Sequence, residues 1–203
     1  MDRGKFITLE GLDGAGKTTH VAWLADHLRV HGRTVVVTRE PGGTPLGERL
    51  RDLVLQEPMH ADTEALLMFA ARQEHLQSLI LPALDAGQWV VCDRFTDATM
   101  AYQGGGRGIS LDRLAILERW VQGDLQPDLT LFFDVPVATA LARLPQGEAR
   151  DRFEQEQRAF FERVRATYQQ RVAAFPQRIR LVKGDEPVAV VRKSLQEELS
   201  ILC

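Results

Sequence analysis

A glycine-rich loop near the N-terminus constrains the fold of this chain more than any other feature. Residues 11–18 read Gly-Leu-Asp-Gly-Ala-Gly-Lys-Thr, which fits the Walker A pattern of Gly, four residues, Gly-Lys-Ser/Thr. The loop follows a short apolar run, Phe6 to Leu9, and precedes a stretch with helical spacing, Thr18 to Val30. In this context the backbone N–H groups and the helix N-terminus surround phosphate oxygens. The chain is therefore expected to bind a nucleotide through a strand-loop-helix unit.

Short apolar runs alternate with longer amphipathic stretches along the whole chain. Runs that are apolar on successive residues are typical of strands buried on both faces, and their alternation with helices predicts a parallel sheet covered on each side. The expected strands lie near 6–9, 34–38, 89–92, 129–133 and 179–182. The expected helices lie near 18–30, 45–55, 63–86, 111–122, 137–144, 151–175 and 187–202. The glycine-rich segments 41–43 and 104–108 are expected to be turns. One domain over residues 1–203 is the simplest organisation for this length.

Charge and cysteine content exclude several classes of function. A formal net charge of -3 does not favour bulk adhesion to nucleic acid or to an anionic membrane. Two cysteines, Cys92 and Cys203, make neither a disulfide framework nor a metal cluster. The sequence shows no leader-like segment and no apolar stretch of membrane-spanning length, so we expect a cytoplasmic protein that binds neither nucleic acid nor membrane.

The Walker A loop predicts the roles of its own residues but leaves the reaction open. The segment from Gly11 to Thr19 is expected to hold ATP, with Lys17 reaching the β and γ phosphates and the Thr18 hydroxyl on Mg²⁺. The ATP-binding residues are expected to be Gly11, Leu12, Asp13, Gly14, Ala15, Gly16, Lys17, Thr18 and Thr19. GTPase switches usually read guanine with an Asn-Lys-x-Asp loop, and this chain contains no asparagine. Another P-loop nucleoside or nucleotide kinase and a non-catalytic nucleotide-binding regulator stay open as alternatives.

Two further segments resemble the signature stretches of bacterial thymidylate kinases. They are Thr38-Arg39-Glu40-Pro41-Gly42-Gly43-Thr44 after the second expected strand, and residues 93–108, which begin Asp93-Arg94-Phe95-Thr96, after the third. Residues 66–72 and 151–154 extend the resemblance over nearly the whole chain in order. The resemblance implies a three-layer α/β P-loop fold with a five-stranded parallel sheet and a short lid at about 144–152. It also implies Mg²⁺-dependent transfer of the ATP γ-phosphoryl to dTMP, and a homodimer.

The resemblance also implies roles for individual residues. Arg39, Arg51 and Arg94 are expected to hold the acceptor phosphate, Arg94 also touches the transferred group, and Asp93 organises Mg²⁺ through water. Around the acceptor nucleoside, Phe69 is expected to stack on the base, Arg72 to bind its edge, and Thr99 and Gln103 to make polar contacts. Tyr102 is expected to crowd the sugar 2′ position, and Asp13 to meet its 3′-hydroxyl. In many members of the family the aromatic residue that stacks on the base lies four residues before the arginine that matches Arg72. Met68 holds that place here and Phe69 lies three residues before Arg72, so either Phe69 or Met68 faces the base.

The expected lid supplies the last set of candidates. Because the Walker loop itself carries no arginine, the resemblance implies that a lid arginine stabilises charge on the transferred phosphoryl group. Arg150 and Arg152 are the expected catalytic residues, and Arg143 is a further candidate. The loop Lys183-Gly184-Asp185-Glu186-Pro187 resembles the one that packs on the adenine of ATP.

Overall fold

A single parallel sheet of five strands forms the centre of the molecule. The computed structural model describes residues 3–144 and 151–202. The strands are β1 (Phe6–Gly11), β2 (Val35–Arg39), β3 (Trp89–Asp93), β4 (Leu129–Asp134) and β5 (Ile179–Lys183), in the order β2-β3-β1-β4-β5. Every pairing is parallel. The predicted five-stranded parallel α/β fold is therefore confirmed.

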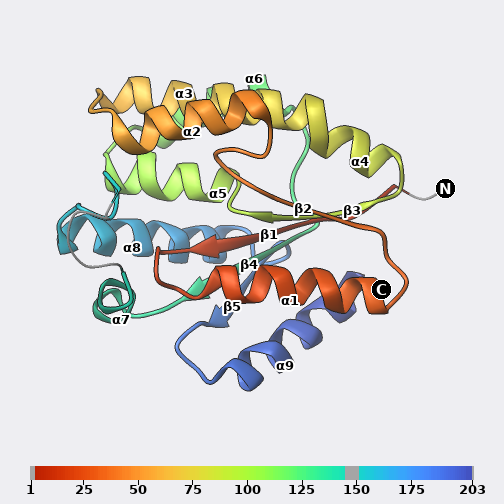
Figure 1. Ribbon diagram of the computed structural model, residues 1–203. Coiled ribbons are helices and arrows are strands. Elements are labelled where there is room, and N and C mark those ends of the chain that lie inside the picture. The colour runs from red at the N-terminus through yellow and green to blue at the C-terminus, as the bar shows by residue number, and fades with distance from the viewer. Residues whose placement is uncertain (1–2, 145–150, 203) are drawn as a thin grey trace.

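Helices cover both faces of this sheet, which gives three layers. In Figure 1, α1 (Lys17–Val30) and α9 (Val188–Leu199) lie below the sheet, and most of the other helices lie above it. The remaining elements are α2 (Pro45–Gln56), α3 (Ala61–His75), η1 (Leu76–Ile80), α4 (Leu81–Asp85), α5 (Thr96–Thr99), η2 (Met100–Gly106), α6 (Leu111–Gln122), α7 (Val137–Ala142), α8 (Arg158–Ala174) and η4 (Ser200–Leu202). The long helix expected over 63–86 is thus α3, a π-helical turn η1 and α4 in succession.

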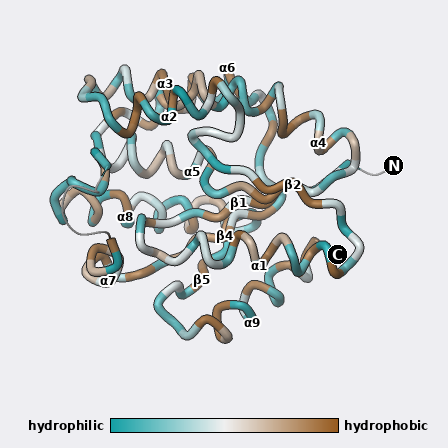
Figure 2. Tube along the Cα trace, viewed as in Figure 1, coloured by the Kyte–Doolittle hydropathy of each residue, from teal (hydrophilic) through white to brown (hydrophobic). Residues whose placement is uncertain are grey.

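The core follows from the apolar runs of the strands. All six residues of β1 are buried, and the hydrophobic colour in Figure 2 runs through the central strands. Because both faces of the sheet carry helices, each strand residue is removed from water whichever way it points. Among the described residues no helix is both long and apolar enough to cross a membrane.

The glycine-rich segment 104–108 is mostly helical, so the turn expected there is wrong. Gly104, Gly105 and Gly106 lie in η2, which packs against α8. A Cβ at Gly105 would collide with Oγ1 of Thr167, and one at Gly106 would lie 2.5 Å from the Phe160 ring. These glycines therefore serve close helix-helix approach rather than a reversal of the chain.

The helix expected from residue 151 begins only at Arg158. Residues 152–155 form a turn, in which Oδ1 of Asp151 accepts hydrogen bonds from the N–H groups of Phe153 and Glu154 at 2.8 and 2.9 Å. An Asp that bonds the backbone two and three residues on favours a turn over a continuing helix. The backbone N–H of Arg152 donates to the Leu55 carbonyl at 3.1 Å, which fixes this turn against α2.

The sheet order brings three strand ends together. Asp93 at the end of β3 pairs with Leu9 of β1 and with Arg39 of β2. The segments that follow these strands therefore open on one edge of the sheet, where parallel α/β proteins place their ligand sites.

Candidate active site

The Walker loop has the curled backbone that phosphate binding requires. Gly16 precedes α1 with a φ of 92°, and Gly14 has a φ of 80°, a left-handed region that glycine adopts readily. A Cβ at Gly14 would also collide with the Ala140 carbonyl of α7. Lys17 is buried, and its Nζ donates to the carbonyl oxygens of Gly11 and Leu12 at 3.1 and 2.9 Å. The loop and the helix start together form a concave surface of N–H donors beside a buried cation.

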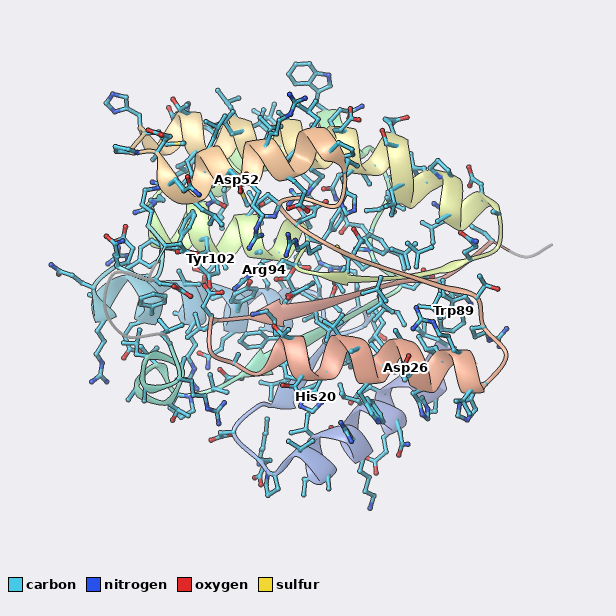
Figure 3. The ribbon with its side chains drawn as sticks, in the orientation of Figure 1. His20, Asp26, Asp52, Trp89, Arg94 and Tyr102 are labelled. Atoms are coloured by element: carbon cyan, nitrogen blue, oxygen red, sulfur yellow. The ribbon has the colours of Figure 1, made fainter. Side chains whose placement is uncertain are left out.

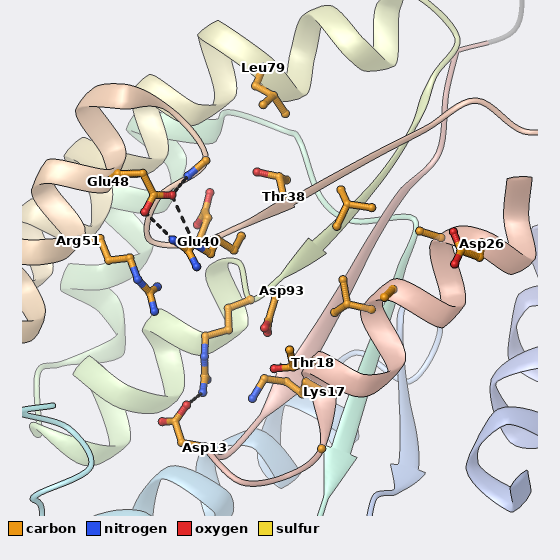
Figure 4. A pocket seen from close by; sticks show the side chains of 18 of the residues that line it. Asp13, Lys17, Thr18, Asp26, Thr38, Glu40, Glu48, Arg51, Leu79 and Asp93 are labelled. Atoms are coloured by element: carbon orange, nitrogen blue, oxygen red, sulfur yellow. Dashed lines mark hydrogen bonds and ion pairs between the residues drawn. The ribbon is translucent and has the colours of Figure 1, made fainter. Parts of the chain in front are cut away.

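A cavity of about 950 Å³ extends from this loop across the ends of β1, β2 and β3. Its walls include most of the predicted phosphate-binding residues, namely Asp13, Gly14, Gly16, Lys17, Thr18, Arg39, Arg51, Asp93 and Arg94. In Figure 4, Lys17, Thr18 and Asp93 lie on one side of the cavity, and Arg51 lies on the other. Leu12 and Ala15 point into the core, and Thr19 is exposed on α1. Leu12 and Ala15 thus face away from the cavity with their side chains.

Arg94 lies where the loop, β1 and η2 meet. Its Nη1 donates to the Gly11 carbonyl at 2.8 Å, and its Nη2 donates to Oδ1 of Asp13 at 2.5 Å. Figure 3 labels Arg94 and Tyr102, which lie close together. The Arg94 guanidinium is 4.8 Å from the centroid of the Tyr102 ring. Its φ of 71° is the one positive value among the described non-glycine residues. Such a conformation is costly and is held here by surrounding contacts, which is typical of a functional position.

Arg39 and Arg51 form the opposite wall of the cavity. They are held by contacts with α2 and with the segment that precedes it. Arg39 pairs with Glu48, whose Oε2 accepts from Nη2 at 2.7 Å, and the N–H of Gly43 donates to Oε1 of the same carboxylate. Nη1 of Arg51 donates to the Pro41 carbonyl at 3.0 Å. Burial, with Arg39 and Arg94 nearby, lowers the pKa of Arg51. Three guanidinium groups so close together favour an anion between them.

Charges around the loop shift one another's titration. Burial of Asp13 opposes its ionisation, but Arg94 and Lys17 outweigh that effect and lower its pKa to about 2. Burial and the neighbouring Arg94 lower the pKa of Lys17 to about 8. Burial alone would lower the pKa of Arg94, yet Asp13 holds that pKa well above its usual range. The site thus holds fixed charges of both signs in a poorly solvated space, where electrostatic effects are strong.

The residues predicted to hold Mg²⁺ fit a cation bound mostly through water and phosphate. Oδ1 of Asp93 is buried and has no hydrogen-bond partner among residues 3–144 and 151–202. Thr18 lines the same cavity at the start of α1. Within those ranges no cluster of three or more His, Cys, Asp or Glu side chains could hold a metal ion alone. Mg²⁺ commonly needs only one or two protein ligands beside substrate phosphates, so this donor set suits it.

The comparisons with known proteins agree with this geometry. The family model for thymidylate kinase matches residues 9–195. The chain belongs to the thymidylate kinase family. It is 64% identical to a thymidylate kinase of Bordetella petrii, over 98% of this chain and 97% of that protein. It is 60% identical to one of Cupriavidus metallidurans, over 98% of this chain and the full length of that protein.

A solved structure of the thymidylate kinase family has the same fold. The crystal structure of thymidylate kinase from Ehrlichia chaffeensis superposes with a TM-score of 0.80 at 34% identity, covering 98% of this chain and 99% of that one. The P-loop architecture inferred from the sequence is thereby confirmed.

A second, smaller cavity of about 60 Å³ is lined by some of the residues that the family resemblance assigns to the acceptor nucleoside. Met68, Tyr102 and Gln103 line it, together with Leu55, Ala98 and Phe153. Asp13, Glu40, Arg51 and Arg94 line both cavities. The small cavity therefore opens onto the same charged groups as the large one.

Phe69 does not line either cavity, whereas Met68 lines the smaller one. The Phe69 side chain is 2% exposed and packs with Ala65, Met100 and Leu114. Its ring supports Arg72, whose guanidinium lies 5.0 Å from the Phe69 centroid and 4.9 Å from that of Phe95. Of the two candidates for the base-facing residue, this packing favours Met68 and gives Phe69 a supporting place.

Arg72 is held in a buried network that leaves one nitrogen unpaired. Its Nε donates to Oε2 of Glu40 at 2.7 Å, and its Nη2 donates to the Thr99 hydroxyl at 2.9 Å. Nη1 is buried with no hydrogen-bond partner in the described part of the chain. His75 also bonds Glu40, at 3.0 Å from Nδ1. Neither Arg72 nor Thr99 lines either cavity, and the two residues predicted to contact the base contact each other.

Tyr102 and Asp13, predicted to face the sugar, contact each other. The Tyr102 hydroxyl donates to Oδ2 of Asp13 at 2.9 Å and accepts from Nη2 of Arg94 at 3.2 Å. The phenol ring is buried against Phe153 and Phe160. This ring and carboxylate therefore form one rigid wall of the small cavity.

The arginines expected to act from the lid differ in what they contact. Arg143 lines the large cavity, and its Nη1 donates to the carbonyls of Gly14 and Gly184 at 3.2 and 3.4 Å. Arg152 instead donates to the Val54 carbonyl at 2.9 Å and to Oε2 of Glu64 at 2.6 Å. Arg150 lies outside the described residues. Of the two that are described, Arg143 lies nearer the phosphate loop.

Four buried polar residues were not identified from the sequence. Glu10, Glu40, Glu64 and Tyr168 lie beneath or beside the site. Glu10 accepts from the Phe95 N–H at 2.7 Å and from the Tyr168 hydroxyl at 2.8 Å. Burial, with Asp97 nearby, raises the pKa of Glu10 to about 7. An acid within an apolar strand was the available signal for Glu10, whereas the partners of the others are set by tertiary packing.

Proposed function

We propose that this chain transfers the γ-phosphoryl group of ATP to dTMP, giving dTDP and ADP. The observation that carries the proposal is one continuous cavity with the Walker loop on one wall and Arg39, Arg51 and Arg94 on the other. Such an arrangement suits two phosphate chains that meet end to end. Positioning and charge neutralisation are the main ways by which proteins speed phosphoryl transfer, and no covalent enzyme intermediate is required.

The donor nucleotide is proposed to occupy the Walker loop from Gly11 to Thr19. Lys17 would leave its two carbonyl partners and bind the β and γ phosphates, since its buried ammonium already lies inside the loop. Thr18 and, through water, Asp93 would hold Mg²⁺. The metal would neutralise charge on the phosphates.

The acceptor phosphate is proposed to lie between Arg39, Arg51 and Arg94. Arg94 is held by Asp13 and the Gly11 carbonyl, so its guanidinium is fixed before substrate binds. A fixed cation costs no reorganisation when charge develops on the transferred group. Arg94 is therefore the residue proposed to touch both the acceptor and the transferred phosphoryl.

Thymine and deoxyribose are proposed to bind at the smaller cavity, whose volume of about 60 Å³ must increase to admit them. Gln103, which lines this cavity, would supply a polar contact to the base. Arg72 lines neither cavity and is bound to the cavity-lining Glu40, and its unpaired Nη1 is the donor proposed for a carbonyl oxygen of the base. Met68 supplies the apolar contact that was expected of Phe69, and Thr99 acts by holding Arg72. Tyr102 would exclude a 2′-hydroxyl, and Asp13 would accept from the 3′-hydroxyl.

The lid arginines are proposed to act on the transferred group when the cavity is filled. Arg143 already contacts the loop at Gly14, and Arg150 and Arg152 remain candidates. Arg152 would have to leave Glu64 to do so. A cation delivered in this way stabilises negative charge in the transition state.

A homodimer in the cytoplasm is the proposed state of the protein. Leu66 on α3 and Ile116 and Trp120 on α6 are 55%, 67% and 81% exposed. Helices α3 and α6 pack against each other, so these side chains form one apolar face, which a second copy would cover.

Turnover of a panel of monophosphates tests the proposed function. ADP release would be measured with Mg²⁺, ATP and dTMP, dUMP, UMP, CMP, GMP or AMP. We expect the highest kcat/KM for dTMP, a lower value for dUMP and little turnover of the rest. Equal efficiency with UMP or CMP would refute the thymidylate assignment and leave a broader monophosphate kinase.

A further inference from the structure

Glu64 is a buried carboxylate on which three side chains converge. It lies in the first turn of α3 and is fully buried. Its oxygens accept from Nε2 of Gln103 at 2.8 Å, from Nε of Arg107 at 3.1 Å and from Nη2 of Arg152 at 2.6 Å. Arg107 and Arg152 balance its charge, which is the usual condition for burying a carboxylate. The contact with Gln103 is not needed for that balance.

This contact determines which way the Gln103 amide points. An ionised carboxylate can only accept hydrogen bonds, so the Gln103 side chain must turn its NH₂ group toward Glu64. The amide oxygen, Oε1, then lies on the other side, and it is buried with no partner among residues 3–144 and 151–202. Gln103 lines the smaller cavity. The residue therefore offers an acceptor, and not a donor, to a bound base.

Gln103 carries one free acceptor at the smaller cavity, and Arg72, which lines neither cavity but is bound to the cavity-lining Glu40, carries one free donor. The free Nη1 of Arg72 is the donor, because Glu40 and Thr99 occupy its other nitrogens. The pairing edge of thymine carries an N3–H donor beside the O4 acceptor. The same edge of cytosine carries an N3 acceptor beside an amino group, so both positions are reversed. Two facing acceptors or two facing donors would leave buried polar groups unpaired, which is costly.

We propose that Glu64 is a specificity-determining positioning residue, which fixes the Gln103 amide so that its oxygen meets N3–H of thymine. The proposal rests on the proposed function, since it assigns the orientation of a group at that nucleoside site. Glu64 touches no substrate and acts only through Gln103.

Glu64→Gln tests this role because a neutral amide at position 64 can either donate or accept. The Gln103 amide then becomes free to turn over. We expect the preference for dTMP over dCMP, measured as the ratio of binding constants by calorimetry and of kcat/KM, to fall about tenfold, the value of one hydrogen bond. In a Gln103→Ala background the same substitution should change the ratio by less than about twofold, because the group through which it acts is gone.

Arg107→Ala is the matched control. It removes one guanidinium from the same carboxylate but leaves the bond to Gln103 in place. The ratio should stay at the wild-type value. Equal losses of preference in Arg107→Ala and Glu64→Gln, or an equal effect of Glu64→Gln with and without Gln103, would overturn the proposal in favour of a general packing role.

A measurement on the unaltered protein covers the case in which Glu64→Gln does not fold. The side-chain NH₂ protons of Gln103, assigned by their loss in Gln103→Ala, should be protected from exchange both before and after dTMP binds. Free exchange before binding would refute the inference. If the unaltered protein shows no preference for dTMP over dCMP, the proposed function fails instead, and the two failures are thereby distinguished.

Discussion

Arg94 and Asp13 are joined by a hydrogen-bonded ion pair of 2.5 Å, which links the end of β3 to the Walker loop. The pair lies in the wall shared by the two cavities. Asp13 thereby orients a guanidinium that also contacts the Gly11 carbonyl and the Tyr102 hydroxyl. The position of Arg94 is thus set by the loop that is proposed to hold ATP.

Arg94→Lys tests whether this geometry, and not the charge alone, matters. Lysine keeps the positive charge but cannot contact Asp13 and Gly11 with two fixed nitrogens. We expect kcat to fall by at least about 100-fold, with the fold retained by circular dichroism. The control is Arg158→Lys, at an exposed arginine that pairs with Glu162 one helical turn away. Near-normal turnover of folded Arg94→Lys would contradict the assignment.

Glu10→Gln should change how stability depends on pH. The pKa of Glu10 is raised from 4.5 to about 7, so between these values the folded protein binds a proton that the unfolded chain releases. Folding stability from this group is complete below about pH 4.5 and is lost as the pH rises through 7. The groups that face Glu10 are Asp97, Arg94 and Tyr168.

The measurement is the free energy of unfolding by urea at several pH values. The difference between wild type and Glu10→Gln should drift by roughly 3 kcal/mol between pH 4.5 and about 7, because each pH unit in this window is worth about 1.4 kcal/mol. Other titrating groups cancel in that difference. Glu57→Gln, at an exposed site on the α2 end, should give a constant difference, and a constant difference for Glu10→Gln as well would disprove the raised pKa.

Arg143→Ala is expected to lower kcat more than it weakens dTMP binding. Arg143 contacts the phosphate loop and not the smaller cavity. Removing a cation that acts on the transferred group should lower kcat by about 10-fold or more. The Kd for dTMP should stay within about twofold of the wild-type value. Arg150→Ala and Arg152→Ala should follow the same pattern. Normal turnover in all three variants and in the triple variant would exclude a lid arginine from catalysis.

Tyr102→Ala should relax the choice between deoxyribose and ribose. Removing the buried phenol opens space beside Asp13, so the ratio of kcat/KM for UMP over dUMP should rise about tenfold or more. Tyr102→Phe keeps the ring and loses only the hydroxyl contacts with Asp13 and Arg94. An unchanged ratio in Tyr102→Phe together with a raised ratio in Tyr102→Ala would assign the selection to the ring. A raised ratio in neither variant would contradict the sugar assignment.

Trp120→Glu should separate the proposed dimer into monomers. A carboxylate in the centre of an apolar interface has no partner and is costly to bury. Sedimentation velocity would measure the mass in solution. Val30→Glu is the control, because Val30 is 84% exposed at the end of α1, on the opposite layer from α6 (Figure 1). A dimer that persists in Trp120→Glu would place the interface elsewhere.

The sequence predicted the strands better than the segments between them. Four of the five expected strands are one or two residues longer in the structure, and β2 is shifted by one residue. The agreement is close because burial on both faces leaves a local signal in the sequence. The turn at Asp151 and the helical η2 were mispredicted, since each depends on a tertiary contact. Gly105 is an example, because it fits against Thr167 on a helix that lies 62 positions further along the chain.

The residues of the candidate site also divide into those that sequence motifs indicate and those that only the tertiary structure brings together. Lys17, Thr18 and Arg94 could be found because their motifs have fixed spacing next to a strand. Glu64 and Glu40 could not be found, because the sequence does not show which arginines will neutralise a given acidic residue. The choice between Met68 and Phe69 depends on the rotation of α3 about its axis, which one residue of spacing does not determine.

Asp13, Glu40, Arg51 and Arg94 form walls of both cavities, so the two substrates are expected to bind with thermodynamic linkage. Phosphate charge bound in the large cavity changes the potential at these four residues, and therefore at the smaller cavity that they also line. Whatever factor ATP applies to the dissociation constant of dTMP, dTMP must apply to that of ATP, because the binding cycle closes. Two arginines and two carboxylates thereby make the affinity for each substrate depend on whether the other is bound, which is a property of the shared wall rather than of either cavity alone.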